Sequence, residues 1–292
     1  MSLRLKPLHP HFVAEASGID ISRPLSDESV GQINAAMNEF AVLVWRGTPL
    51  SGQQQLDFAK AFGPLDMGLK KVFKRPERLE DERLIDISNV DAEGRVARRD
   101  SPKNLSNFAN QLWHSDSSFQ DPRAAYSMLH ALVLPSRGGA TEFADLRAAY
   151  DTLPEDLKTL VADLKAEHYA LHTRILLGDD AYTDEQKKAI PPAVWPLVQT
   201  HPGSGRKLLF VGVHARQIIG WPTAEGRLLL SDLLEHATRH EGVYSHEWRV
   251  HDLVMWDNRS TLHRGRRYDL SERRELRRTT IEDVPEARLA AA

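Results

Sequence analysis

Short strand-like runs separated by turns dominate the sequence after Ala125, and helices are inserted between them. Tyr126–Leu134 is an apolar, strand-like run, and Pro196–Val213 has the form of a β-hairpin whose turn is His201–Lys207. Tyr244–Ile281 is a series of short strands with charged turns. This order differs from the regular strand–helix alternation of a parallel sheet. It predicts a mainly β protein with α insertions, built on a double-stranded β-helix (jelly-roll) core flanked by helices.

Capping signals and apolar periodicity predict three of the helices. Ser26 begins an amphipathic helix that runs to Phe40. Thr152–Leu164 carries an apolar stripe, and Thr152 and Glu155 have the spacing of a capping box. A further amphipathic helix follows Thr223. The default expectation for 292 residues without internal repeats is one domain over 1–292.

The stretch 67–110 is polar, charged and poor in hydrophobic periodicity. We expect long loops there. Loops of this length in a compact domain often form lids or binding segments, so 67–110 is a candidate lid.

Composition excludes several kinds of site. The chain has no cysteine, which rules out disulfides, thiolate metal sites, iron–sulfur clusters and cysteine nucleophiles. A net charge of −3 argues against a nucleic-acid partner. No stretch has the apolar length of a signal peptide or a membrane span, so we expect no membrane partner and a cytoplasmic location. We also expect a homo-oligomer.

A possible metal site is the sharpest local feature. His114 and Asp116 are two positions apart, so both side chains project to the same side of an extended segment. His263 follows a strand-like run far downstream. Two imidazoles and one carboxylate form the facial triad that leaves three positions of an octahedral metal open. Taken alone the pattern is weak: His-x-Asp occurs by chance, and the two histidines could be a hydrogen-bonded loop residue and a strand-end residue.

Longer motifs surround these residues and occur in a fixed order. Together they resemble the taurine/2,4-dichlorophenoxyacetate family of Fe(II)/2-oxoglutarate dioxygenases, over nearly the whole chain from Pro7 to about Asp283. The segments that carry the resemblance are Trp113–Phe119, Gly138–Tyr150, Trp256–Arg264 and Arg273–Arg278.

The resemblance implies iron, 2-oxoglutarate and O2 as cofactor and co-substrates. It implies His114, Asp116 and His263 as catalytic metal ligands, with Thr141 and Arg274 binding the distal carboxylate of 2-oxoglutarate. A planar, always-charged guanidinium suits that carboxylate. The competing interpretation of Arg274 is a solvated or ion-paired arginine in an arginine-rich segment.

Three further residues are candidates for binding the carboxylate of a small anionic aromatic substrate. Arg278 lies four residues beyond Arg274, so both would share one face of a strand. The resemblance also points to His214 and Lys71. Their alternatives are a histidine at a hairpin end and a loop lysine.

The implied reaction is hydroxylation of the carbon next to the ether oxygen of an aryloxyalkanoate such as 2,4-dichlorophenoxyacetate. The products would be a phenol, glyoxylate, succinate and CO2. One alternative is the same chemistry on a sulfonate such as taurine or on another aryl acid. A second, of another class, is a non-catalytic jelly-roll binding protein, which would form no succinate.

Overall fold

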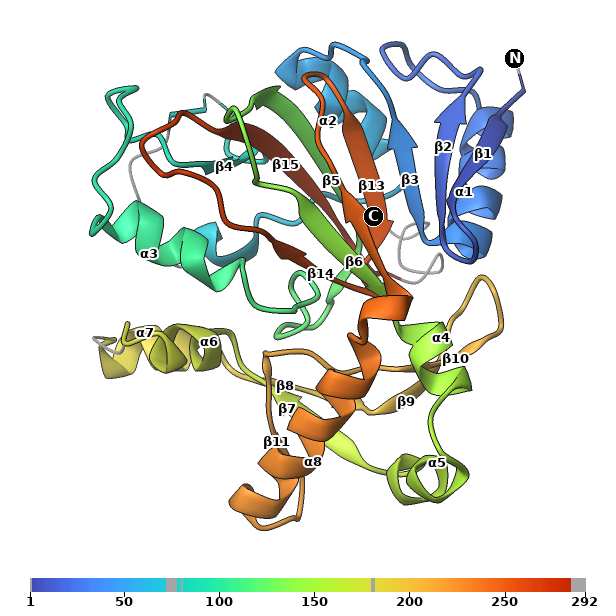
Figure 1. Cartoon of the computed structure of the whole chain (residues 1–292), viewed down its shortest axis with the longest axis vertical. Coiled ribbons are helices and arrows are strands. Elements are labelled where there is room, and N and C mark those ends of the chain that lie inside the picture. Colours follow the sequence, from blue (N-terminus) through green and yellow to red (C-terminus); the bar gives the residue numbers. More distant parts are fainter. Residues whose placement is uncertain (1, 72–77, 80, 180–181, 285–292) are drawn as a thin grey trace.

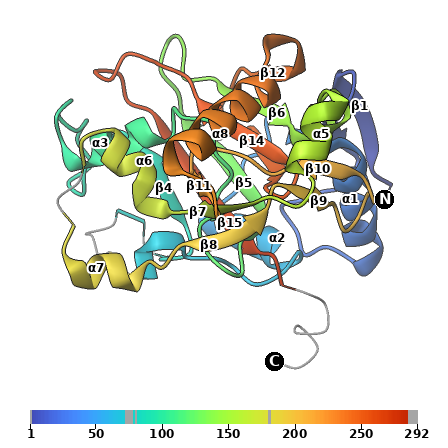
Figure 2. The same cartoon turned by 90° about the horizontal axis from the view of Figure 1, so that it is seen from below.

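The computed structural model describes residues 2–71, 78–79, 81–179 and 182–284 (Figures 1 and 2). The largest sheet in these residues has seven strands in the order β1-β2-β3-β13-β5-β15-β4. Neighbouring strands are antiparallel except β2 and β3, which are parallel. The strands are β1 (Arg4–His9), β2 (Val13–Ser17), β3 (Val42–Trp45), β4 (Ile85–Ser88), β5 (Ala124–Val133), β13 (Leu253–Asp257) and β15 (Glu275–Glu282).

Smaller sheets and helices complete the described part of the chain. One sheet has the order β12 (Val243–His246), β6 (Thr141–Asp145), β14 (Thr261–Gly265). The others are β11 (Ala215–Ile218), β7 (Lys165–His168), β8 (Ala193–Pro196), and the pair β10 (Lys207–Leu209), β9 (Val198–Thr200). The helices are α1 (Asp27–Phe40), α2 (Gly52–Lys60), η1 (Gly68–Lys71), α3 (Pro102–Ala109), α4 (Leu146–Asp151), α5 (Glu155–Val161), α6 (Ala170–Leu176), α7 (Asp184–Ala189), α8 (Thr223–Ala237) and η2 (His240–Gly242).

Successive side chains of the central strands point to opposite faces of the large sheet, and both faces are buried. In β13, Met255 joins the apolar cluster that includes Met37 of α1. Its neighbour Trp256 joins another cluster, in which its ring centroid is 5.6 Å from that of Phe143 in β6. The sheet therefore packs against α1 on one face and against β6 on the other. Figure 1 shows α5–α8 with β7–β11 on the far side of β6 from the large sheet.

Several predicted elements are confirmed. Ser26 caps α1, and its side chain accepts a hydrogen bond from the backbone N–H of Ser29. The predicted hairpin is present as β9 and β10, in which Thr200 pairs with Lys207. At the level of a mainly β protein with helices around a mixed sheet, the predicted fold class is also confirmed.

The predicted helix Thr152–Leu164 is too long at both ends, since α5 ends at Val161. The helix α5 begins only at Glu155, and its N-cap is Pro154, which makes no side-chain capping bond. The hydroxyl of Thr152 instead donates to the carbonyl of Ala148 at 2.9 Å. Thr152 thus ends the preceding helix α4, because its side chain turns back toward that helix.

The expectation of long loops over 67–110 is only partly correct. The segment contains η1, β4 and α3. The strand β4 pairs with β15, with Ile85 opposite Arg278. It is a short edge strand whose residues are mostly half-buried, so its apolar pattern is weak. Residues 72–77 and 80 of this segment lie outside the described residues.

Among the described helices, none is both long enough and apolar enough to cross a lipid bilayer.

Candidate metal centre and active site

Two backbone hydrogen bonds hold His114 and His263 side by side. The N–H of His114 donates to the carbonyl of His263 at 3.0 Å, and the N–H of His263 donates to the carbonyl of His114 at 2.8 Å. Their ring centroids are 4.2 Å apart. His263 lies in β14, whereas His114 lies in the segment between α3 and β5. The bridge thus joins two parts of the chain that are distant in sequence.

Asp116 completes a cluster with the two histidines. One potential ligand atom from each residue lies within 4.8 Å of the others. Nε2 of His114 is 3.9 Å from Oδ1 of Asp116, and Nε2 of His263 is 3.8 Å from Oδ2. All three side chains are buried. This donor set fits a mononuclear iron site with open coordination positions, as the sequence predicted.

The histidines are prepared to act as neutral ligands. Nδ1 of His114 lies 2.7 Å from the carbonyl of Leu112. Because a carbonyl only accepts, Nδ1 carries the proton and the lone pair of Nε2 is free for a metal ion. Burial lowers the pKa of His114, and it lowers that of His263 well below its ordinary value. Both rings are therefore neutral at neutral pH.

The carboxylate of Asp116 is stabilised in its charged form. Burial alone would raise its pKa, but the positive charge of Arg278 and the hydrogen bond from Ser127 bring the pKa well below its ordinary value. Nη1 of Arg278 donates to Oδ1 of Asp116 at 2.5 Å. The cluster thus combines an ionised carboxylate with two neutral imidazoles.

A connected set of buried hydrogen bonds fixes the orientation of that carboxylate. The hydroxyl of Ser127 donates to Oδ2 of Asp116 at 2.7 Å and accepts from Nδ2 of Asn258 at 2.9 Å. Oδ1 of Asn258 in turn accepts from the backbone N–H of Asp116 at 3.1 Å and from the indole N–H of Trp256 at 2.9 Å. Every member of this set is buried, so the amide and hydroxyl orientations are determined by their partners.

A small cavity of about 70 Å³ lies beside the cluster and is lined by His114, His263, Thr141 and Arg274. The guanidinium of Arg274 is buried; Nη2 donates to the carbonyl of Gly139 at 2.9 Å, and Nε has no hydrogen-bond partner in the described part of the chain. Burial lowers its pKa to about 10. Within the described residues no carboxylate pairs with it. The guanidinium lies over the ring of Tyr268, 5.3 Å from its centroid, but a buried guanidinium without a carboxylate partner is costly, so these residues fit an incoming carboxylate such as that of 2-oxoglutarate.

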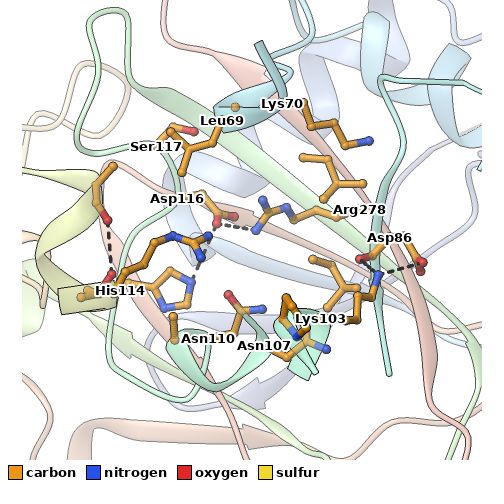
Figure 3. Close-up of a pocket in the computed structure, with 18 of the residues that line it drawn as sticks. Leu69, Lys70, Asp86, Lys103, Asn107, Asn110, His114, Asp116, Ser117 and Arg278 are labelled. Atoms are coloured by element: carbon orange, nitrogen blue, oxygen red, sulfur yellow. Dashed lines mark hydrogen bonds and ion pairs between the residues drawn. The ribbon is translucent and has the colours of Figure 1, made fainter. Parts of the chain in front are cut away.

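A larger cavity of about 530 Å³ also reaches the cluster (Figure 3). His114, Asp116 and Arg278 lie in its wall, together with apolar side chains such as Leu69 and Phe119. Much of the remaining wall comes from the segment 67–110. The cavity can therefore hold a mainly apolar molecule that carries a negative charge near the metal cluster.

Comparison with known proteins places these features in a family. The family described as "Taurine catabolism dioxygenase TauD, TfdA family" matches residues 4–280. The chain belongs to this TauD/TfdA family. The predicted family, the Fe(II)/2-oxoglutarate dioxygenases of the taurine/2,4-dichlorophenoxyacetate group, is thereby confirmed, and the chain is a dioxygenase.

Individual TauD/TfdA relatives align over almost the whole chain. An α-ketoglutarate-dependent 2,4-dichlorophenoxyacetate dioxygenase of Cupriavidus pinatubonensis is 58% identical, covering 97% of this chain and 99% of its own. An (S)-phenoxypropionate/α-ketoglutarate dioxygenase of Sphingobium herbicidovorans is 33% identical, covering 99% and 98%. The crystal structure of AAD-2 in complex with Mn(II) and N-oxalylglycine has a TM-score of 0.93 at 43% identity, covering 97% and 99%.

Two of the three predicted substrate-binding residues of this TauD/TfdA protein, Arg278 and His214, line the larger cavity. Arg278 lies in β15 and lines both cavities; it shares the small one with Arg274, which lies just before that strand. His214 lines the larger cavity, with its ring centroid 6.0 Å from that of His114. Burial lowers the pKa of His214 well below its ordinary value, so it would offer a hydrogen bond rather than a charge. The side chain of Lys71 lies outside the described residues, and its role stays a prediction.

Sequence reasoning missed the residues that support the site from behind. Ser127 and Asn258 orient Asp116, and Trp248 donates from its indole N–H to the hydroxyl of Thr141 at 3.0 Å. A single serine inside the apolar run of β5 was the only local signal for Ser127. The roles of Asn258 and Trp248 depend on strand pairing, which no local pattern specifies.

Proposed function

We propose that this TauD/TfdA-family enzyme uses Fe(II), 2-oxoglutarate and O2 to hydroxylate the carbon next to the ether oxygen of an aryloxyalkanoate such as 2,4-dichlorophenoxyacetate. The hydroxylated product is a hemiacetal, which collapses to a phenol and glyoxylate. One oxygen atom of O2 enters succinate and the other enters the new hydroxyl group, while 2-oxoglutarate loses CO2. The single observation that carries this proposal is the larger, mostly apolar cavity that reaches His114, Asp116 and Arg278.

The metal ligands and the co-substrate anchors have separate roles in this proposal. His114, Asp116 and His263 hold the iron, which when bound supplies the activation of O2 coupled to oxidation of 2-oxoglutarate. Arg274 and Thr141 bind the distal carboxylate of 2-oxoglutarate in the small cavity. These anchors fix the direction in which the co-substrate enters the metal site.

The larger cavity positions the second substrate. Arg278 attracts the carboxylate of the aryloxyalkanoate, and His214 offers a neutral hydrogen-bonding partner beside Phe119. The aromatic ring occupies the apolar part of the cavity, where it excludes water from the reacting C–H bond. The relatives that act on 2,4-dichlorophenoxyacetate and phenoxypropionate support this choice of substrate class.

A sulfonate such as taurine, or another aryl acid, is the alternative within the same chemistry. The family description names taurine catabolism, and a sulfonate could also bind to Arg278. A two-carbon sulfonate would leave most of the apolar cavity empty, which favours an aryl substrate. The non-catalytic alternative gives no reason for a buried Arg274 without a carboxylate partner among the described residues.

An anaerobic visible spectrum with Fe(II) and 2-oxoglutarate is the first test. The chelate should give a weak charge-transfer band, and that band should shift when the true substrate is added. Aerobic assays should then compare 2,4-dichlorophenoxyacetate, cinnamates and taurine, measuring succinate, glyoxylate and sulfite. Glyoxylate and phenol formed together with succinate support the proposal. Sulfite from taurine at a higher kcat/KM would replace the proposed substrate, and no succinate from any substrate would exclude the activity.

The architecture forms part of the same proposal. The sheet β12-β6-β14 faces the large sheet, and we propose that the two form the double-stranded β-helix (jelly-roll) core. Alignment of relatives over nearly their full length supports one catalytic domain over 1–292. The cytoplasmic location and the homo-oligomer stay predictions; gel filtration would test the second.

A further inference from the structure

The indole of Trp248 lies directly behind the proposed 2-oxoglutarate anchor. Trp248 follows β12, in which His246 pairs with Thr141 of β6. This pairing brings the indole Nε1 within 3.0 Å of the Thr141 hydroxyl oxygen. The ring is half-buried against the apolar cluster between the sheets, and the His246 ring meets it edge-on with centroids 4.5 Å apart. Both contacts hold the indole in place.

The chemistry of the indole determines the direction of this hydrogen bond. An indole N–H can only donate, so the hydroxyl oxygen of Thr141 must accept. The Thr141 hydroxyl then keeps its own proton for another acceptor. Within the described residues its side chain makes no second hydrogen bond. Thr141 lines the small cavity, whereas Trp248 is not part of that lining.

We propose that Trp248 is a positioning residue for 2-oxoglutarate, acting through Thr141. This inference rests on the proposed function, in which Thr141 and Arg274 bind the distal carboxylate. The indole fills an acceptor position of the hydroxyl, so the remaining proton is directed to the carboxylate. Without the indole, the hydroxyl loses this constraint, and its oxygen lone pairs can face the anion, which is repulsive.

The first experiment compares Trp248→Phe with the matched control Trp221→Phe, which removes an indole from the α8 side of the molecule. Calorimetry on the Mn(II)-loaded full chain without substrate measures the Kd of 2-oxoglutarate and of pyruvate. Pyruvate has the same 2-oxo acid group but no distal carboxylate. Trp248→Phe should weaken 2-oxoglutarate binding by about three- to ten-fold, the effect of losing one neutral hydrogen bond, and leave pyruvate binding unchanged. Trp221→Phe should change neither. In turnover, KM for 2-oxoglutarate should rise while kcat changes little.

The second experiment adds Thr141→Val and the double variant. Thr141→Val alone should weaken 2-oxoglutarate binding by about ten-fold or more, and Trp248→Phe should add nothing in that background. One outcome is that Thr141→Val binds 2-oxoglutarate more weakly while Trp248→Phe binds it like the parent. In that case the positioning role of Trp248 is wrong, and the role of Thr141 in binding the distal carboxylate is supported. If Thr141→Val itself has no effect, the anchor in the proposed function is wrong. Equal loss of pyruvate and 2-oxoglutarate binding in Trp248→Phe, or an additive double variant, would show a general disturbance and overturn the inference.

Discussion

Nη1 of Arg278 lies 2.5 Å from Oδ1 of Asp116, and the same arginine forms part of the wall of the larger cavity (Figure 3). Ser127 contacts the other carboxylate oxygen of Asp116. Contacts within the protein therefore hold both oxygens of the carboxylate. In the proposed function, Arg278 thus couples the charge of the metal site to the charge of the bound substrate.

Replacing Arg278 by Gln should weaken binding of the substrate anion. We expect KM for 2,4-dichlorophenoxyacetate to rise by at least ten-fold, because a buried hydrogen bond to a charged group contributes about 1.5–3 kcal/mol. KM for 2-oxoglutarate should change by less, since Arg274 and Thr141 remain. Steady-state kinetics with each substrate varied separately give both values. If Arg278→Gln loses metal affinity but keeps the substrate KM, Arg278 serves Asp116 alone.

Asp116→Ala should abolish both 2-oxoglutarate turnover and substrate loss. The variant removes the only carboxylate of the His114–Asp116–His263 cluster. Succinate and phenol should be measured in the same reaction. Asp232→Ala, at an exposed position of α8, serves as the control and should keep parental rates. Full activity of Asp116→Ala would show that the metal site has been assigned to the wrong residues.

Arg274→Lys should raise KM for 2-oxoglutarate by roughly ten- to a hundred-fold. An ammonium group cannot reproduce the planar fork of the guanidinium, which donates to the carbonyl of Gly139 and has further N–H groups for a carboxylate. Activity with a high concentration of pyruvate in place of 2-oxoglutarate should be affected much less. A variant with an unchanged KM would place the distal carboxylate elsewhere.

Asn258→Ala should lower both stability and metal affinity. The change leaves the indole N–H of Trp256 and the backbone N–H of Asp116 without their acceptor. We expect a loss of about 1–3 kcal/mol in unfolding free energy and a ten- to hundred-fold weaker metal affinity, as for other groups that orient metal ligands. Denaturant unfolding and a Mn(II) titration measure the two. A stable variant with normal metal binding would show that Asn258 is not needed to orient Asp116.

The metal-free chain should lose stability as the pH falls from 7 to 5. Burial lowers the pKa of His168 to about 3 and that of His130 to about 4. Below about pH 6.5 the unfolded chain therefore binds protons that the folded chain does not, so each such histidine lowers stability by up to about 1.4 kcal/mol per pH unit. Asp116 contributes no slope here, because its carboxyl is ionised in both states. Urea unfolding at both pH values measures the slope.

His168→Gln tests the source of that slope. The variant should be less sensitive to pH between 7 and 5 than the parent, whatever its absolute stability. Lys188→Gln, at an exposed position of α7, should keep the parental slope. An unchanged slope in His168→Gln would mean that other groups titrate in this range.

The sequence predicted best those features that are determined by neighbouring residues. The Ser26 cap is such a case, since its bond reaches only to Ser29. The metal ligands were found because His114 and Asp116 share one short motif and His263 ends another. Thr152 shows the limit: its spacing to Glu155 fits a capping box, but Thr152 ends α4 and its hydroxyl donates back to the carbonyl of Ala148.

Features that arise from strand pairing could not be predicted in this way. The contact between Trp248 and Thr141 exists because β12 pairs with β6 in one register. Likewise, Ser127 meets Asn258 because β5 lies beside β13. Sequence alone specifies neither the neighbour nor the register of these strands, so the residues that support the site remained unidentified.

The reciprocal backbone bridge between His114 and His263 closes a loop of about half the chain. A metal ion held by these two residues and Asp116 would act as a cross-link over the same loop. The unfolded chain has no preformed site, so binding free energy becomes folding free energy. Iron supply would then affect more than catalysis: under metal limitation, the population of folded enzyme and its resistance to proteases would fall together.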